Sequence, residues 1–138
     1  MASPPPTAEV SLRWITALQF EGAGPGKPPI TVDGDTQVAT SPVQLLLLAA
    51  GTCTASDVVL ILQKQRVVLA SLEIAVRGTR REEDPRRFTA IHLQFTVRGE
   101  GATEDKVRRA VDLSIEKYCS VVATLAPDVK VTSDITLA

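Results

Sequence analysis

Aromatic side chains and histidine are scarce in this sequence. Its 138 residues include one Trp, one Tyr, three Phe and one His. So few aromatic rings leave little on which nucleic-acid bases could stack. The formal net charge of −1 also offers no general attraction for phosphates. The sequence therefore predicts an aliphatic core and no nucleic-acid partner.

Cysteine is also scarce, and Cys53 and Cys119 are the two present. Two cysteines so far apart in the chain do not make a disulfide framework. Together with the single His92 they lack the ligand spacing of a zinc site, so we expect no metal. A chain of 138 residues is long enough to bury a core without such staples.

The N-terminus, MASPPPTAE, has neither the basic nor the apolar segment of a secretory signal. Its prolines predict a disordered lead-in over residues 1–9, followed by a single domain over residues 10–138. Residues 43–62 have about the length of a membrane span, but they contain Gln44, Thr52 and Asp57. We therefore expect a core helix, no membrane and a cytoplasmic location.

Apolar periodicity predicts the element order β-β-α-β-β-α-β, which is an α+β fold. The predicted strands cover residues 10–20, 30–32, 71–77, 91–98 and 129–137. The predicted helices begin at Ser41-Pro42 and at Thr103, where a capping residue precedes helical spacing.

The first helix is the most apolar part of the chain, and Cys53 lies in its middle. Leucine, valine and alanine occupy nearly all sides of it, a pattern typical of a helix that is buried all round. In a chain this short, we expect a partner chain to cover part of that surface. Small residues flank Cys53 and leave room for another element to approach it.

The second helix has an acidic first turn after Thr103, and Cys119 comes at its end. Its spacing predicts a buried stripe formed by Val107, Ala110, Val111, Ser114 and Tyr118. Both cysteines are therefore expected on helices.

The residues alone leave two interpretations of the thiols open. Free cysteine packs as a small hydrophobe, so both could be inert. They could also form a redox pair in which one thiolate attacks a peroxide and becomes a sulfenic acid. The other thiol would then resolve the sulfenic acid as a disulfide. That chemistry needs Cα atoms within roughly 7 Å and a stabilised thiolate.

Three segments carry a resemblance to a known family. They are SPVQLLLLAAGTCTASDVVLILQK, RREEDPRRFTAIHLQFTV and RAVDLSIEKYCSVVATL. They resemble the OsmC/Ohr family of thiol-dependent hydroperoxide reductases over nearly everything after residue 30. The sequences around Asp57 and around Tyr118-Cys119-Ser120 most resemble the YhfA-like branch.

The resemblance implies an OsmC-like fold in an intertwined homodimer, with two central helices back to back between sheets. It implies that Cys53 is the peroxide-reactive thiol and Cys119 the resolving one. The expected activity is that of a cysteine-based, peroxiredoxin-like peroxidase of the oxidative stress response. Its substrate would be an organic hydroperoxide or another small electrophile. The resemblance also implies no bound cofactor and recycling by a dithiol such as a lipoylated protein.

The sequence departs from the family pattern at the start of the first helix. The hydroperoxide reductases have there a Glu that holds an Arg, and this Arg stabilises the thiolate. Here the position is Val43. The candidate cations are Arg13 or Lys27 of the N-terminal region, or Arg80 or Arg81 of a partner chain. Two alternatives follow: a non-catalytic dimer that binds a small apolar ligand, or Cys53 chemistry on a non-peroxide electrophile that does not need Cys119.

Overall fold

The computed structural model describes residues 3–138. These residues form two compact units, one up to Leu45 and one from Leu46 to Ala138. The predicted lead-in starts with residues 1 and 2, which lie outside the described residues. Residues 3–10 are exposed and carry no regular secondary structure. The single domain over residues 10–138 stays a prediction.

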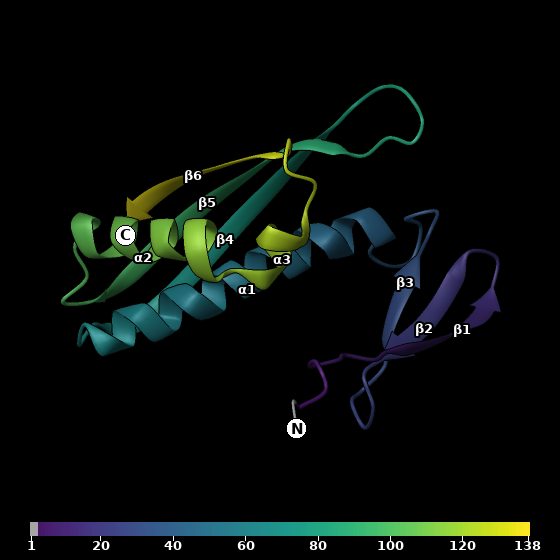
Figure 1. Ribbon diagram of the computed structural model, residues 1–138, viewed down its shortest axis with the longest axis horizontal. Coiled ribbons are helices and arrows are strands. Elements are labelled where there is room, and N and C mark those ends of the chain that lie inside the picture. Colours follow the sequence, from purple (N-terminus) through teal and green to yellow (C-terminus); the bar gives the residue numbers. More distant parts are fainter. Residues whose placement is uncertain (1–2) are drawn as a thin grey trace. The chain divides into compact units, whose positions relative to one another are not determined.

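The N-terminal unit contains a three-stranded antiparallel sheet in the order β1-β2-β3 (Figure 1). Its strands are β1 Ser11–Thr16, β2 Gln19–Ala23 and β3 Ile30–Asp33. Strand β3 agrees with the predicted strand over residues 30–32, but the single strand over residues 10–20 was wrong, because β1 and β2 divide it.

The chain reverses at Ala17, whose φ is 48°, and β1 and β2 pair across this turn. The Trp14 Nε1–H donates to the Ala17 carbonyl oxygen at 2.8 Å and holds the turn. Neither Gly, Pro nor Asn marks the reversal, and the apolar alternation continues through it, so the sequence carries no turn signal there.

Asp33 organises the loop that leads from β3 to the first helix. Its buried carboxylate accepts the backbone N–H groups of Asp35 at 2.9 Å, Gln37 at 3.0 Å and Val38 at 2.9 Å. The hydrogen bond from Val38, followed by that from Asp35, holds the pKa of Asp33 below its ordinary value, while desolvation opposes them. The charge therefore stabilises the loop in the conformation that starts the helix.

Helix α1 spans Pro42–Lys64 and begins as predicted. The Gln44 N–H donates to Ser41 Oγ at 3.2 Å, and the Ser41 N–H donates to Gln44 Oε1 at 3.0 Å. This reciprocal pair is a capping box, which satisfies two backbone donors at the helix start.

The C-terminal unit contains a second three-stranded sheet in the order β4-β5-β6 (Figure 1). The strands are β4 Val68–Arg80, β5 Phe88–Glu100 and β6 Lys130–Leu137. Strand β5 pairs antiparallel with β4 and parallel with β6. Alternate β5 side chains, Leu93, Phe95 and Val97, are fully buried and form the centre of the core.

Two helices pack on this core. Val58 and Leu62 of α1 and Val107, Ala110 and Val111 of α2 Glu104–Leu113 belong to the same buried cluster as the β5 side chains. A Cβ added at Gly51 would lie 2.9 Å from Val76 Cγ2, so glycine allows α1 to approach β4 closely. The predicted N-cap is confirmed, because Thr103 accepts the Lys106 N–H.

Within one chain, α1 is covered on one side. Its buried residues are Ala50, Gly51, Thr54, Val58 and Leu62. Leu48 is 55% exposed and Leu60 is 58% exposed on other sides of the helix. The predicted burial of α1 on all sides thus depends on a second chain. By length and composition α1 could also cross a bilayer, and the expectation of no membrane stays a prediction.

The segment after α2 differs from the predicted continuous helix. A π-helical turn, η1 Ser114–Tyr118, is followed by the non-helical Cys119 and a short helix, α3 Ser120–Thr124. The predicted burial of Tyr118 was wrong, since its side chain is 52% exposed. The wider π turn changes which side of the helix each following residue faces, so α-helical spacing fails beyond Ser114.

Candidate active site

Cys53 and Cys119 are brought together by the fold of the C-terminal unit. Cys53 lies in the middle of α1 and is half-buried, whereas Cys119 is only 3% exposed. Both thiols are free, and Cys53 is near enough to perturb the pKa of Cys119. Cys53 on α1 and Cys119 between η1 and α3, far apart in the sequence, therefore belong to one site.

The Cys119 sulfur accepts two hydrogen bonds. The Thr54 hydroxyl donates to it at 3.5 Å, and the Val122 backbone N–H donates at 3.4 Å. Burial is the largest influence on this thiol and raises its pKa above the ordinary value. The two donors lower the pKa, and Cys53 raises it further. The balance keeps Cys119 protonated at neutral pH.

A second polar contact fixes the turn that carries Cys119. The fully buried Ser114 hydroxyl donates to Asp57 Oδ2 at 2.8 Å, joining η1 to α1 one turn beyond Cys53. The Cys119 N–H donates to the Ser114 carbonyl oxygen at 2.8 Å and closes the π turn. Asp57 and Ser114 thus anchor the turn that directs Cys119 toward α1.

Sequence reasoning missed these supporting residues. A signal for Asp57 was present, because it is the first charge after a long uncharged stretch and sits on an apolar helix. For Thr54 there was none, since a threonine in a helix gives no indication of its partner. The π turn at Ser114 likewise has no residue pattern of its own.

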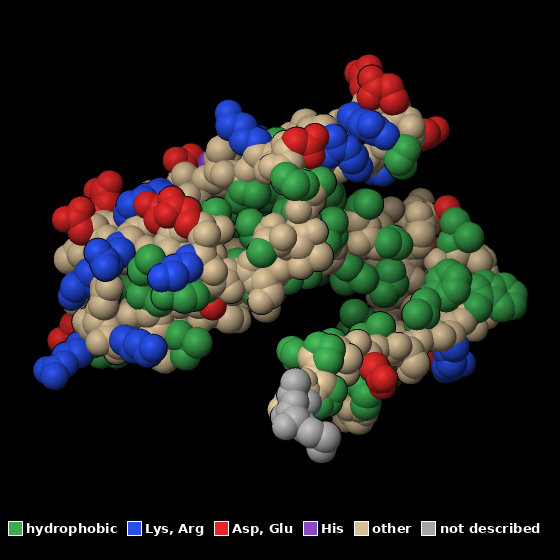
Figure 2. All heavy atoms as spheres, viewed as in Figure 1, with side chains coloured by type: hydrophobic (Ala, Val, Ile, Leu, Met, Phe, Trp, Pro, Cys, Tyr) green, Lys and Arg blue, Asp and Glu red, His purple; other side chains and the backbone are tan. Residues whose placement is uncertain are grey.

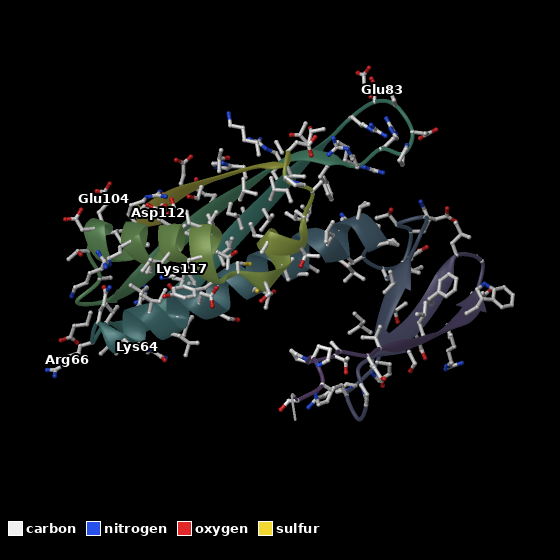
Figure 3. The ribbon with its side chains drawn as sticks, viewed as in Figure 1. Lys64, Arg66, Glu83, Glu104, Asp112 and Lys117 are labelled. Carbon is white, nitrogen blue, oxygen red and sulfur yellow. The ribbon has the colours of Figure 1, made fainter. Side chains whose placement is uncertain are left out.

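Lysine and arginine side chains do not donate a hydrogen bond to either sulfur among residues 3–138. Arg13 pairs with Glu21 at 2.8 Å within the N-terminal unit. Lys117, labelled in Figure 3, is close to Cys119 in sequence, but its Nζ lies 5.6 Å from the centroid of the Tyr118 ring. Val43, where the resemblance leads one to expect a Glu, is a half-buried residue in the first turn of α1.

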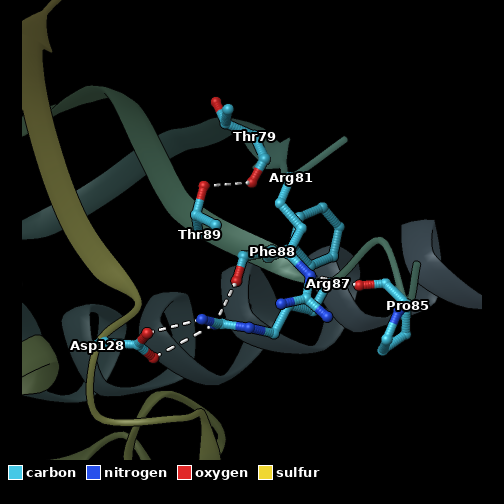
Figure 4. A network of polar contacts seen from close by, with 7 residues as sticks. All are labelled: Thr79, Arg81, Pro85, Arg87, Phe88, Thr89 and Asp128. Atoms are coloured by element: carbon cyan, nitrogen blue, oxygen red, sulfur yellow. Dashed lines mark hydrogen bonds and ion pairs between the residues drawn. The ribbon is translucent and has the colours of Figure 1, made fainter. Parts of the chain in front are cut away.

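The predicted partner-chain cations Arg80 and Arg81 lie at the β4–β5 loop, whose tip carries Glu83 (Figure 3). The Arg80 Nε–H donates to the Arg86 carbonyl oxygen and the Arg81 Nε–H to that of Pro85, both at 2.6 Å. Arg87 forms a two-point ion pair with Asp128, at 2.6 and 3.2 Å (Figure 4). The base of the loop is therefore tied to the segment between α3 and β6.

Comparison with known proteins decides the family. The family model described as OsmC-like protein matches residues 33–134. This chain belongs to the OsmC family. Protein YhfA of Escherichia coli K12 is 43% identical over 125 residues, which cover 90% of this chain and 93% of YhfA. The predicted family and its YhfA-like character are confirmed.

Solved structures of other proteins share the fold. A hypothetical protein from Aquifex aeolicus is 29% identical, with a TM-score of 0.84 over 97% of this chain and 99% of that one. The organic hydroperoxide resistance protein OhrB of Bacillus subtilis is 17% identical, with a TM-score of 0.63 over 94% and 98%. The predicted α+β, OsmC-like fold is confirmed.

Proposed function

We propose that this protein reduces organic hydroperoxides with Cys53 and Cys119. The observation that carries the proposal is the proximity of the two free thiols, one of which perturbs the pKa of the other. The name of the OhrB neighbour agrees with this chemistry.

The difference in exposure assigns the roles. Cys53 is half-buried and open to a substrate, so its thiolate attacks the peroxide and becomes a sulfenic acid, releasing the alcohol. Cys119 is buried, and its raised pKa keeps it as a thiol until the sulfenic acid forms beside it. Its sulfur then displaces water and forms the disulfide. One hydroperoxide and two thiols thus give one alcohol, one water and one disulfide.

A dithiol such as a lipoylated protein completes the cycle by reducing this disulfide, and no bound cofactor is required. We place the reaction in the cytoplasm, where dithiols are kept reduced. Leu47 and Leu48, together with the valines after Cys53, give α1 an apolar character that favours an organic substrate over hydrogen peroxide.

We also propose that the working form is a homodimer. The exposed leucines of α1 and the apolar face of the N-terminal sheet are large surfaces for a protein of this size to leave in water. Figure 2 shows hydrophobic side chains on the visible surface of both units. A partner chain is also the proposed source of the cation, since among residues 3–138 neither sulfur accepts a hydrogen bond from a lysine or arginine.

Non-reducing mass spectrometry after one equivalent of cumene hydroperoxide tests the activity. We expect a Cys53–Cys119 disulfide in the wild type and a Cys53 sulfenic acid in Cys119→Ser. If neither species forms, the peroxidase proposal is wrong. If Cys119→Ser turns over as fast as wild type, Cys53 acts alone, which would favour chemistry on another electrophile.

The variant Val43→Glu tests whether restoring the family's Glu activates the Cys53 thiol. If a cationic side chain reaches Cys53, a carboxylate at this position should hold it and speed the reaction with peroxide, as in the family pattern. Val43→Gln is the matched control, because it has the same size without the charge. Equal rates for both variants would mean that no such cation is in reach.

An apolar cavity supports the second candidate, a dimeric protein that binds a small apolar ligand. The cavity has a volume of about 610 Å³ and lies within the N-terminal unit. Leu12, Phe20 and Ile30 are among its lining residues, and Lys27 supplies a cation. Co-purification of a lipid-like ligand, with full peroxide survival of a Cys53→Ala strain, would select this function over the first.

A further inference from the structure

Thr54 places a hydroxyl group in the apolar stripe that α1 buries. Its side chain is 0% exposed, and its neighbours in the stripe are Ala50, Val58 and Leu62. A buried hydroxyl without a partner destabilises a protein. The partner of this one is the Cys119 sulfur at 3.5 Å. Thr54 therefore faces Cys119, although it follows Cys53 directly in the sequence.

Thr54 and Val122 both act as donors to the same sulfur. The Val122 N–H lies 3.4 Å from Cys119 Sγ, on the side of α3. Donors strengthen their hydrogen bonds when the acceptor becomes charged, so this arrangement suits a thiolate better than a thiol. Accordingly, both contacts lower the pKa of Cys119 against the larger, opposing effect of burial.

The two sulfurs also differ in access. Cys119 is 3% exposed, whereas Cys53 is half-buried. A dithiol that attacks their disulfide therefore reaches the Cys53 sulfur, and Cys119 must be the sulfur that leaves. The rate of thiol–disulfide exchange rises when the leaving thiolate is better stabilised.

We propose that Thr54, with the Val122 N–H, stabilises the Cys119 thiolate as the leaving group when a dithiol attacks the disulfide at Cys53. One thiolate of the dithiol bonds to the Cys53 sulfur, the S–S bond breaks, and Cys119 takes the bonding electron pair. The second thiol of the dithiol then attacks the first dithiol sulfur, which is bonded to Cys53 in the mixed disulfide. Cys53 leaves as a thiolate, and the dithiol becomes a cyclic disulfide. This inference rests on the proposed function and concerns its recycling half.

The test compares Thr54→Val, which keeps the shape and removes the hydroxyl, with Thr54→Ser, which keeps the hydroxyl. Each protein is oxidised with diamide and then reduced with dithiothreitol, and thiols are counted by alkylation and mass spectrometry after acid quenching. We expect Thr54→Val to be reduced about tenfold more slowly, the cost of losing one hydrogen bond to a charged group. Thr54→Ser should be reduced at nearly the wild-type rate.

Thr52→Val is the matched control. Thr52 directly precedes Cys53 in the sequence, and its side chain is exposed. It therefore receives the same substitution without a hydrogen bond to Cys119. It should be reduced at the wild-type rate. If Thr54→Val does not fold, as judged by its circular dichroism, Thr54→Ala replaces it in the same comparison.

A second readout separates stabilisation of the thiolate from a general loosening of the site. In a Cys53→Ala background, the rate of Cys119 alkylation against pH reports the pKa of Cys119. Thr54→Val should raise that pKa, Thr54→Ser should restore it, and Thr52→Val should leave it unchanged. Asp57, the other ionisable group tied to this turn, is the same in all these proteins.

The outcomes distinguish this inference from the proposed function. If diamide forms the Cys53–Cys119 disulfide and Thr54→Val slows its reduction, the inference is retained. If peroxide forms no such disulfide in the same protein, the peroxidase proposal is rejected. Equal reduction rates and an unchanged Cys119 pKa in Thr54→Val would overturn the inference. So would a mixed disulfide trapped at Cys119 when a monothiol replaces the dithiol. Failure of diamide to form the disulfide would overturn both.

Discussion

The two units of the chain differ in what they bury. Every hydrophobic residue that is buried among residues 3–138 lies in the C-terminal unit, from Ala50 onward. In the N-terminal unit the buried residues of the described chain are polar, Asp33 and Ser41. The C-terminal unit has a core made by its own sheet and helices. The N-terminal unit is instead held by backbone pairing and by hydrogen bonds to one carboxylate.

This difference indicates how the N-terminal unit must be stabilised. A small sheet without a covered hydrophobic face is at best marginally stable in water. The unit also exposes Leu12 by 66%, Trp14 by 64% and Ile30 by 55%. Its stability therefore depends on a covering surface, for which a second copy of the chain is our proposal.

The largest expected effect comes from a matched pair of leucines. Leu93→Ala should lower the free energy of unfolding by about 2–5 kcal/mol, because Leu93 is fully buried. Leu12→Ala, at an exposed position, should cost about 0.5 kcal/mol or less in a monomer. Urea unfolding at low protein concentration measures both. A similar cost at Leu12 would mean that the N-terminal sheet is covered in solution.

The next largest effect concerns the uncovered side of α1. Leu60→Lys places a charge where we propose that a second copy packs, so it should convert a dimer into a monomer. Light scattering after size-exclusion chromatography gives the mass. Glu104→Lys, at an exposed position on α2 rather than on α1, is the control and should stay dimeric. A wild-type protein of monomeric mass would refute the dimer.

A smaller effect is expected at Asp33, with a defined pH dependence. Its lowered pKa means that it stabilises the folded state above the ordinary value of 3.8. This contribution is lost as the pH falls through the lowered pKa. Hydrogen exchange of the Val38 amide should therefore quicken relative to intrinsic exchange on acidification. In Asp33→Asn the protection should be weaker at neutral pH and vary less with pH.

Asp35→Asn is the control for that experiment. Its side chain is exposed and accepts none of the hydrogen bonds that the Asp33 carboxylate accepts. The same acid response in wild type and Asp33→Asn would assign the effect to another carboxyl group.

The smallest effect is expected from Cys119, in the opposite pH direction. Its raised pKa means that the folded state loses stability as the pH rises above the ordinary value of 9.0 toward the folded value. The slope stays below about 1.4 kcal/mol per pH unit, the limit for one proton. Urea unfolding under reducing conditions should show this loss in wild type and not in Cys119→Ala.

Cys53→Ala should retain most of the loss at high pH, because burial is the main cause of the raised pKa and Cys53 a lesser one. If Cys53→Ala abolishes the loss, the interaction between the thiols outweighs burial.

Local sequence patterns were enough for most elements. The N-cap at Ser41, the N-cap at Thr103 and the alternation in β5 each depend on neighbours within a few residues, and each prediction is confirmed. Errors arose where no residue type marked the change, at the Ala17 turn and at the π turn after Leu113. Both sites look regular in sequence because the apolar spacing continues through them.

The sequence by itself determined the family, the order of most elements and the presence of two thiols. Only the tertiary structure decided that Cys119 meets α1, that Thr54 and Val122 donate to its sulfur, and that Asp57 anchors its turn. The physical reason is distance along the chain. These contacts join residues that come together only after α1 and α2 pack on β5, and no local pattern encodes that packing.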